Sequence, residues 1–146
     1  MTADTAAFGR PVAGSSTGQE AGLTERGYDW AVISHDDVRH IAESLPGAYE
    51  QASFGGRPSW RTTPRMFAWI REDPEALVVW VSSEEEKTAM IASESGRFFT
   101  TAHYDGTPIL LVRLEAVDVI EASELITESW RLRASRTLVK FWDAAH

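Results

Sequence analysis

The sequence predicts an α+β fold, in which an antiparallel β-sheet of about six strands has helices packed on one face. Two observations lead to this prediction. Apolar residues recur at helical spacing in some segments and alternate with polar residues, as in strands, in the segments between them. The resulting order of a helix, four strands, a helix, two strands and C-terminal helices lacks the regular strand–helix alternation of a parallel sheet.

The length of 146 residues and the hydrophobic content of 43% fit one domain with a buried core. Residues 1–27 differ from the rest, because they are rich in Ala, Gly, Ser and Thr and contain few large apolar side chains. Such a segment buries too little surface to offset a backbone entropy cost of about 1–2 kcal/mol per residue. We therefore expect a flexible N-terminal leader over residues 1–27 and a single α+β domain over residues 28–146.

The first helix is expected to begin at Ser34, a good N-cap residue, because two aspartates follow it and apolar residues then recur at helical spacing. Pro46-Gly47 ends this helix. The period is two in the next segment, where turn residues separate four short strands, near 49–54, 58–63, 65–71 and 76–82. We expect these strands to form an antiparallel meander.

The second half of the domain is expected to contain the remaining helices and strands. Ser83 is expected to cap a helix whose acidic first turn, Glu84-Glu85-Glu86, suits the positive end of the helix dipole. Two more strands, near 98–101 and 109–114, are expected to flank a turn and to close the sheet. Asp118 and Ser135 are the expected N-caps of the C-terminal helices.

The formal net charge of −8 argues against nucleic acid as a partner, because phosphate binding depends on cations. Two windows, residues 51–71 and 129–142, nevertheless contain four cations each and no acid. These cations are Arg57, Arg61, Arg65, Arg71, Arg131, Arg133, Arg136 and Lys140. Two interpretations remain open: the cations form a binding face, or they lie on solvated faces and offset nearby carboxylates.

The strand near 65–71 places aromatic rings on one face. We expect alternate residues from Met66 to Ile70 to face the helices, so that Phe67 and Trp69 lie on the open face beside Trp80. Aromatic and arginine side chains on an uncovered sheet bind single-stranded nucleic acid or a partner protein. The alternative is that a helix, the leader or a second subunit covers these rings.

Little in the sequence indicates catalysis. His103-Tyr104-Asp105 is the one local group with acid–base potential, and no nucleophile motif accompanies it, so we do not expect an enzyme. The chain has no cysteine, its four histidines are scattered and no phosphate-binding loop motif occurs, so we expect no metal and no cofactor. The absence of cysteine, of a secretory signal and of an apolar run near the roughly 20 residues of a membrane helix leads us to expect a cytoplasmic protein.

A series of short motifs occurs from about Ser34 to Phe141. The motifs are Asp37-Val38-Arg39, Leu45-Pro46-Gly47, Phe54-Gly55, Arg57-Pro58-Ser59-Trp60-Arg61, Met66-Phe67-Ala68, Gly96-Arg97-Phe98-Phe99, His103-Tyr104, Val112-Arg113-Leu114 and Ser129-Trp130-Arg131-Leu132. In order and spacing they resemble the MmcQ/YjbR family, a family of unknown function that is often labelled DNA-binding. The resemblance implies a frataxin-like fold whose hairpins act as paired wings on DNA, and it implies no catalytic residues.

The chain departs from the pattern of this family at two places. Thr107-Pro108-Ile109 stands where the family has a basic residue and a glycine-rich turn leading into Trp, and Ser135 stands where a proline usually ends the long helix. The first departure puts in doubt any contact of the second hairpin with a polymer.

Two functional hypotheses follow from the sequence. The first is a DNA-binding domain that contacts phosphates through the arginines of a β-hairpin and the cations of the last helices: Arg57, Arg61, Arg65, Arg131, Arg133, Arg136 and Lys140. The second is a protein-interaction or homodimerisation module, without catalysis, that uses an aromatic sheet face formed by Phe67, Trp69 and Trp80.

Overall fold

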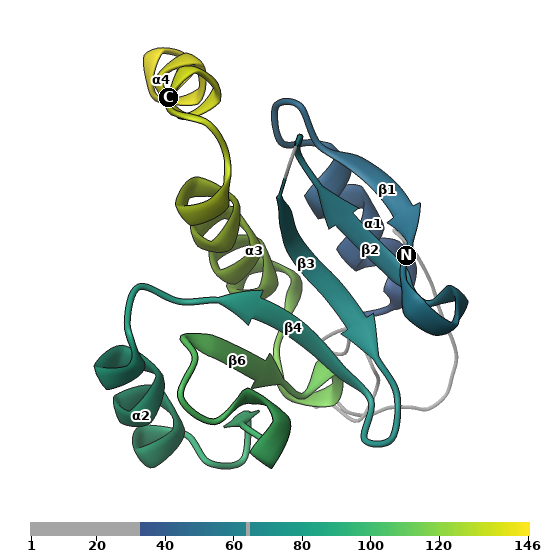
Figure 1. Cartoon of the computed structure of the whole chain (residues 1–146), viewed down its shortest axis with the longest axis vertical. Helices are drawn as coiled ribbons and strands as arrows, with labels where there is room; N and C mark the ends of the chain where they lie inside the picture. The colour runs from purple at the N-terminus through teal and green to yellow at the C-terminus, as the bar shows by residue number, and fades with distance from the viewer. Residues whose placement is uncertain (1–32, 64) are drawn as a thin grey trace, which may run out of the picture. The chain divides into compact units, whose positions relative to one another are not determined.

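The computed structural model describes residues 33–63 and 65–146, and the leader expected at residues 1–27 lies outside this part. In the described part, six strands form one sheet in the order β1-β2-β3-β4-β6-β5, and all neighbouring strands are antiparallel (Figure 1). The strands are β1 (Tyr49–Ala52), β2 (Pro58–Arg61), β3 (Met66–Arg71), β4 (Ala76–Trp80), β5 (Phe98–Phe99) and β6 (Ile109–Val112). The α-helices are α1 (His35–Glu43), α2 (Glu84–Ser93), α3 (Val119–Arg133) and α4 (Arg136–Ala145). The expected α+β fold is confirmed.

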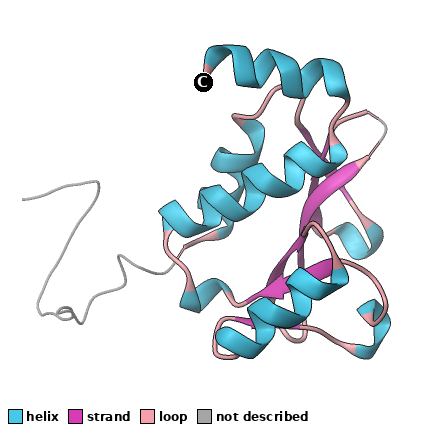
Figure 2. Cartoon of the chain, turned by 90° about the vertical axis from the view of Figure 1, so that its left-hand side faces the viewer, coloured by secondary structure: helices cyan, strands magenta, loops and turns pink. Residues whose placement is uncertain are grey.

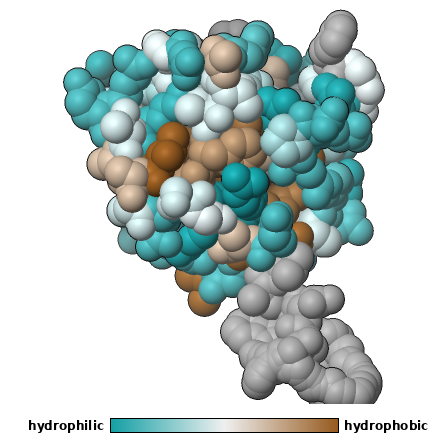
Figure 3. Space-filling view, turned by 90° about the horizontal axis from the view of Figure 1, so that it is seen from below, coloured by the Kyte–Doolittle hydropathy of each residue, from teal (hydrophilic) through white to brown (hydrophobic). Residues whose placement is uncertain are grey.

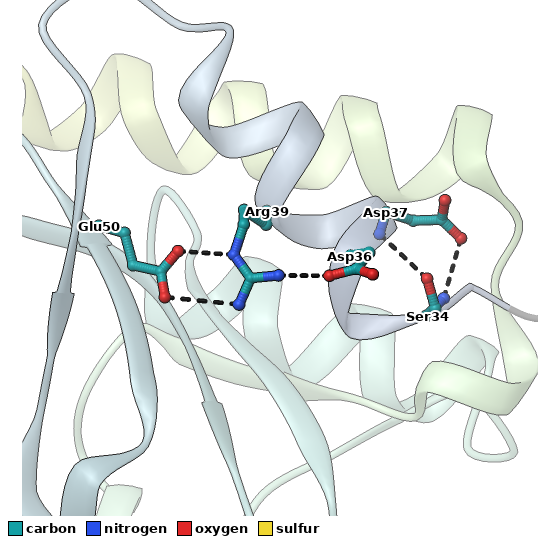
Figure 4. Close-up of polar contacts among 5 residues, drawn as sticks. All are labelled: Ser34, Asp36, Asp37, Arg39 and Glu50. Carbon is teal, nitrogen blue, oxygen red and sulfur yellow. Dashed lines mark hydrogen bonds and ion pairs between the residues drawn. The ribbon is translucent and has the colours of Figure 1, made fainter.

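The helices begin where the sequence predicts. Ser34 Oγ accepts a hydrogen bond from the N–H of Asp37, and the Asp37 carboxylate accepts one from the N–H of Ser34, which completes a capping box (Figure 4). The side chains of Ser83, Asp118 and Ser135 accept the corresponding bond at the starts of α2, α3 and α4. Each helix start therefore has a local cause in the sequence.

Arg39 connects α1 to the edge strand β1. Its Nε donates to Glu50 Oε1 at 2.6 Å, its Nη2 lies 3.4 Å from Glu50 Oε2, and its Nη1 donates to Asp36 (Figure 4). The hydrogen bond from Arg39 lowers the pKa of the Glu50 carboxyl below its ordinary value. Because these side chains are exposed in part, the contact fixes the orientation of α1 more than it adds to stability.

The main core lies between the sheet and the helices on one of its faces. Helices α1 and α3 lie on the same side of the strands (Figure 2), and Trp60 of β2 and Trp130 of α3 are the largest fully buried side chains. The indole N–H of Trp130 donates to the carbonyl of Pro46 at 3.0 Å, so this polar atom is satisfied. The opposite face, here called the open face, has a smaller apolar cluster of Ala76, Val78, Ile109 and Leu111, with Trp69, Trp80, Phe99 and Tyr104 packed against it.

A buried serine of α3 joins two strands at the point where they separate. The β3–β4 pairing ends at Ala68 and Val79. Beyond it, the Ser129 hydroxyl donates to the carbonyl of Phe67 at 2.5 Å and accepts from the N–H of Trp80 at 2.8 Å. Ser129 is completely buried, and it satisfies one backbone group of each strand beyond the end of their pairing.

A β-bulge changes which residues of β3 face the core. Strands β2 and β3 pair Trp60 with Ala68, and the next pair is Arg61 with Met66, so Phe67 is an extra residue. A shift of one residue exchanges the two faces of a strand beyond that point. Phe67 is therefore fully buried in the main core, and Met66 lines the open face. The expected positions of Phe67 and Met66 were wrong for this reason.

Candidate functional site

The cations expected to bind phosphate have different surroundings. Arg131 donates Nη1 to Asp143 Oδ1 at 2.5 Å, and this hydrogen bond raises its pKa. Arg57 is less closely paired, because its Nε lies 3.9 Å from Glu72 Oε1, beyond hydrogen-bond distance. The remaining members are Arg61, which is half-buried on β2, and Arg65, Arg136 and Lys140, which are exposed.

Arg65 and Arg133 bring the two cationic windows together. Arg133, at the end of α3, donates Nε to the carbonyl of Met66 at 3.2 Å, and its guanidinium carbon lies 4.0 Å from the centre of the Trp80 ring. Burial lowers the pKa of Arg133, and the positive charge of Arg65 lowers it further. Because Met66, the first residue of β3, directly follows Arg65 in the chain, the hydrogen bond to its carbonyl places Arg133 at the start of β3. Arg65 and Arg133 are here called the arginine pair.

A groove of about 730 Å³ lies on the open face. Trp69 lines it, as expected from the alternation of side chains along β3, and so do Arg57 and Arg71. His103 and Tyr104 also line it, from the short helix η4 (Ala102–Tyr104), and no pattern in the sequence predicts that they lie beside β3. We call this feature the open-face groove.

The buried lysine of α2 fixes the wall that carries Tyr104. Lys87 is only 5% exposed, and its Nζ donates to the carbonyls of Tyr104 at 2.8 Å and Thr107 at 3.0 Å. The Thr107 hydroxyl donates to the same Tyr104 carbonyl at 2.7 Å. The burial of Lys87 was not predicted. The one indication of it in the sequence is that Lys87 lies on the same side of α2 as the few apolar residues of that helix.

The aromatic rings near the groove are arranged as tilted pairs. The ring centres of Trp69 and Tyr104 are 6.4 Å apart with an angle of 49° between the planes, and His103 meets Tyr104 edge-on at 4.8 Å. Trp80 does not line this groove, because its ring lies beneath the guanidinium of Arg133. Of the three residues expected to form an aromatic face, Trp69 is therefore the one that lines the groove.

A second pocket, of about 260 Å³, is rich in acids. Glu86, Glu121, Glu124 and Glu128 line it together with an apolar floor that includes Trp80 and Phe98. Arg97 also lines it and forms an ion pair with Glu121. Trp80 therefore lines this acidic pocket and also has the guanidinium of Arg133 over its ring.

Apolar side chains are also exposed elsewhere. Ile120 at the start of α3 is 70% exposed, and Phe141 of α4 is 68% exposed. Figure 3 shows apolar residues gathered in the middle of the face seen from below, with hydrophilic residues around them. Exposed apolar residues of this kind are common on protein surfaces and do not by themselves indicate a ligand.

The described residues contain neither a cluster of metal ligands nor a membrane-spanning helix. Within 33–63 and 65–146, no three His, Cys, Asp or Glu side chains lie together in a way that could hold a metal ion. In the same residues, no helix is long and apolar enough to cross a bilayer.

The fold and the site define an α+β protein with one antiparallel sheet, helices on one face, and a groove of cationic and aromatic residues on the other. The chain belongs to the YjbR family, whose model matches residues 43–132. It is 40% identical to the uncharacterized proteins Mb2600 of Mycobacterium bovis and Rv2570 of Mycobacterium tuberculosis, in alignments that cover 72% of this chain and 92% of each relative. The fold is similar to the crystal structure of DR2400 from Deinococcus radiodurans, with a TM-score of 0.60, 19% identity, and coverage of 75% of this chain and 83% of that one.

Proposed function

We propose that this YjbR-family chain is a DNA-binding module that contacts phosphates with the arginine pair and with the exposed cations beside it. The observation that supports this proposal most is the hydrogen bond from Arg133 Nε to the carbonyl of Met66, the residue that follows Arg65. This bond joins two acid-free windows that are far apart in the sequence, and each window supplies one arginine of the pair. Two like charges that repel each other gain when a phosphate lies between them, because the anion is attracted to both.

The surroundings of Arg133 support a binding role for the pair. Its Nε donates to a backbone carbonyl and its plane lies over Trp80, so the guanidinium is held in place before any ligand binds. A fixed guanidinium loses less conformational entropy on binding than a free one. Arg65 is exposed and can adjust to the phosphate.

The other cations contribute unequally in this proposal. Arg57 directly precedes β2, Arg61 is the last residue of β2, and Arg136 and Lys140 lie on α4, and we propose that these four supply additional phosphate contacts. Arg131 does not belong to the proposed contact set, because Asp143 neutralises it. The net charge of −8 repels a polyanion at long range, so we expect weak binding that depends strongly on salt.

We propose that the module acts by binding and without catalysis, in the cytoplasm. His103 packs edge-on against Tyr104 and has no hydrogen bond to a carboxylate or hydroxyl among the described residues, so it lacks the partner that a general base needs. The protein-interaction alternative is less well supported, because Phe67 is buried in the core and Trp80 is occupied by Arg133.

Fluorescence anisotropy with labelled duplex and single-stranded DNA, at 50 and 200 mM salt, tests the proposal. The wild-type chain should bind. The logarithm of its association constant should fall linearly with the logarithm of the salt concentration, with a slope of about 0.9 per phosphate contacted. Arg65→Ala should weaken binding to all sequences alike and reduce the salt slope by about 1. Arg131→Ala is the matched control and should change little, because its charge is already paired.

The DNA-binding proposal fails if neither DNA binds more tightly than about 10⁻⁴ M, the weak end of non-specific affinities. It also fails if Arg65→Ala and Arg131→Ala weaken binding equally, since the arginine pair would then have no special part.

A further inference from the structure

We propose that the open-face groove is a binding site for a small planar aromatic anion: one flat ring system that carries a single carboxylate or phosphate. This inference does not rest on the DNA-binding proposal, because neither member of the arginine pair lines the groove, although Arg57 has a part in both proposals. The volume of the groove, about 730 Å³, is within the range of roughly 300–1,000 Å³ that small-molecule sites occupy.

The charges that line the groove select an anion. Two arginines, Arg57 and Arg71, line it with one acid, Glu72, so the formal charge of these three groups is positive in a chain whose total is −8. A ligand with one negative charge would balance this excess. An uncharged or cationic ligand would leave it unbalanced.

Both arginines have donors available. The Nε of Arg57 is 3.9 Å from Glu72, too far for a hydrogen bond, so its N–H groups can bind a ligand instead. Arg71 donates Nε to the carbonyl of Glu72 at 3.4 Å and Nη2 to that of Asp73 at 3.2 Å. These bonds hold its side chain against the β3–β4 turn, while Nη1 donates to no described residue.

The aromatic rings determine the shape of the ligand. A flat ring inserted between two parallel rings needs about 7 Å between them, that is, two stacking distances of about 3.5 Å. Trp69 and Tyr104 are 6.4 Å apart and tilted by 49°, so they do not form such a slot. The ligand ring would instead stack on the accessible part of one of these rings, with its edge toward the other and its charged group toward Arg57 and Arg71.

The wall opposite β3 is fixed in advance. Lys87 and Thr107 both donate to the Tyr104 carbonyl, and the Tyr104 N–H donates to Thr101 at 2.9 Å. The backbone of Tyr104 is therefore held from both sides, and little additional ordering is needed when a ligand binds. Such preorganisation increases the affinity for a small ligand.

A ¹H–¹⁵N NMR titration of the full chain tests this site. The probe is 2-naphthoate, and its controls are 2-naphthamide, which lacks the charge, and cyclohexanecarboxylate, which lacks the flat ring. We expect saturable shifts of the Trp69 indole N–H and of the amides of residues 101–104 with naphthoate. Each control should bind at least about ten-fold more weakly, because a charge-assisted hydrogen bond or an aromatic contact is lost.

Two substitutions test the assignment of residues. Arg57→Gln, at a half-exposed position that should tolerate the change, should weaken naphthoate binding about ten-fold or more. Arg131→Gln removes a cation outside the groove and should leave the affinity unchanged. Equal binding of naphthoate and its two controls, shifts confined to other residues, or an unchanged affinity in Arg57→Gln would each overturn the proposal.

The anion could come from a free metabolite or from a nucleotide, and two more titrations distinguish these sources. If 5′-dAMP produces the same shifts and single-stranded DNA displaces naphthoate, the groove binds nucleotides within a strand. If single-stranded DNA does not displace naphthoate, the groove serves a free aromatic anion. Because naphthoate binding is measured without DNA, a failure of the DNA-binding proposal leaves this test intact.

Discussion

Replacing Ser129 by Ala should strongly destabilise the domain, because one buried hydroxyl satisfies two separated strands. Ser129 Oγ lies 2.5 Å from the carbonyl oxygen of Phe67 and 2.8 Å from the backbone nitrogen of Trp80, and the serine is completely buried. Alanine leaves both backbone groups without this partner. A buried unsatisfied group costs about 1–3 kcal/mol, so two such groups should together cost about 2–6 kcal/mol.

Urea denaturation followed by tryptophan fluorescence measures this loss as a change in the free energy of unfolding. A loss of this size would be a large part of the roughly 5–15 kcal/mol that stabilises a domain. Ser44→Ala is the matched control, because Ser44 also donates to a backbone carbonyl, that of Ile41 at 2.7 Å, but at an exposed position. It should cost well under 1 kcal/mol.

Hydrogen exchange gives a second, local measurement. The amide of Trp80 should exchange much faster in Ser129→Ala, since it loses its acceptor, while amides in the paired part of β3 and β4 should change only with the global stability. The bridging role of Ser129 is refuted if its substitution costs no more than that of Ser44, or if the exchange of the Trp80 amide is unaffected.

Three further substitutions test other contacts. Lys87→Met should lower the free energy of unfolding by about 1–3 kcal/mol in urea denaturation and weaken naphthoate binding, since the Tyr104 wall loses its anchor; unchanged binding would argue against preorganisation. Glu50→Gln should reduce the loss of stability in acid: the Glu50 pKa is lowered in the folded state, so its contribution is present above the unfolded pKa and disappears as the pH falls through the folded pKa. If the free energy of unfolding of Glu50→Gln falls with decreasing pH as steeply as that of the wild type, this prediction is contradicted. Gly47→Ala should destabilise by at least about 1–2 kcal/mol in thermal melts, because φ is +71° and the new Cβ would lie 2.8 Å from Leu138 Cδ1, whereas Gly96→Ala, with open space around it, should not.

The sequence predicts those parts of the fold that have local causes. The N-caps Ser34, Ser83, Asp118 and Ser135 were all identified correctly, because each acts on an N–H three residues away. The bulge at Phe67 was not predicted. It occurs where β3 leaves β4 and a serine more than 60 residues later bridges the gap, so its cause is tertiary.

In the candidate site, too, features with local causes were predicted and features with tertiary causes were not. Alternation along the strand near 65–71 placed Trp69 on the open face, and the structure agrees. The approach of Tyr104 to Trp69 depends on Lys87, whose hydrogen bonds cross 17 and 20 residues to reach two carbonyls of the same loop. No periodicity in the sequence reports such a contact, because it joins a side chain to backbone atoms whose positions are fixed only by the fold.

The bulge and the arginine stack also change the positions of two of the three aromatic residues that the protein-interaction hypothesis placed on the open face. A stable interface buries about 800 Å² on each partner, usually with several aromatic residues at its centre. Here Phe67 is turned into the core and Trp80 lies beneath Arg133, which leaves Trp69 beside a groove. The three aromatic residues that were predicted to form one face therefore lie in three different surroundings: the core, the underside of Arg133 and the open-face groove. This division is consistent with the two proposed sites, one for phosphates centred on the arginine pair and one for a flat anion in the open-face groove, which have Arg57 in common.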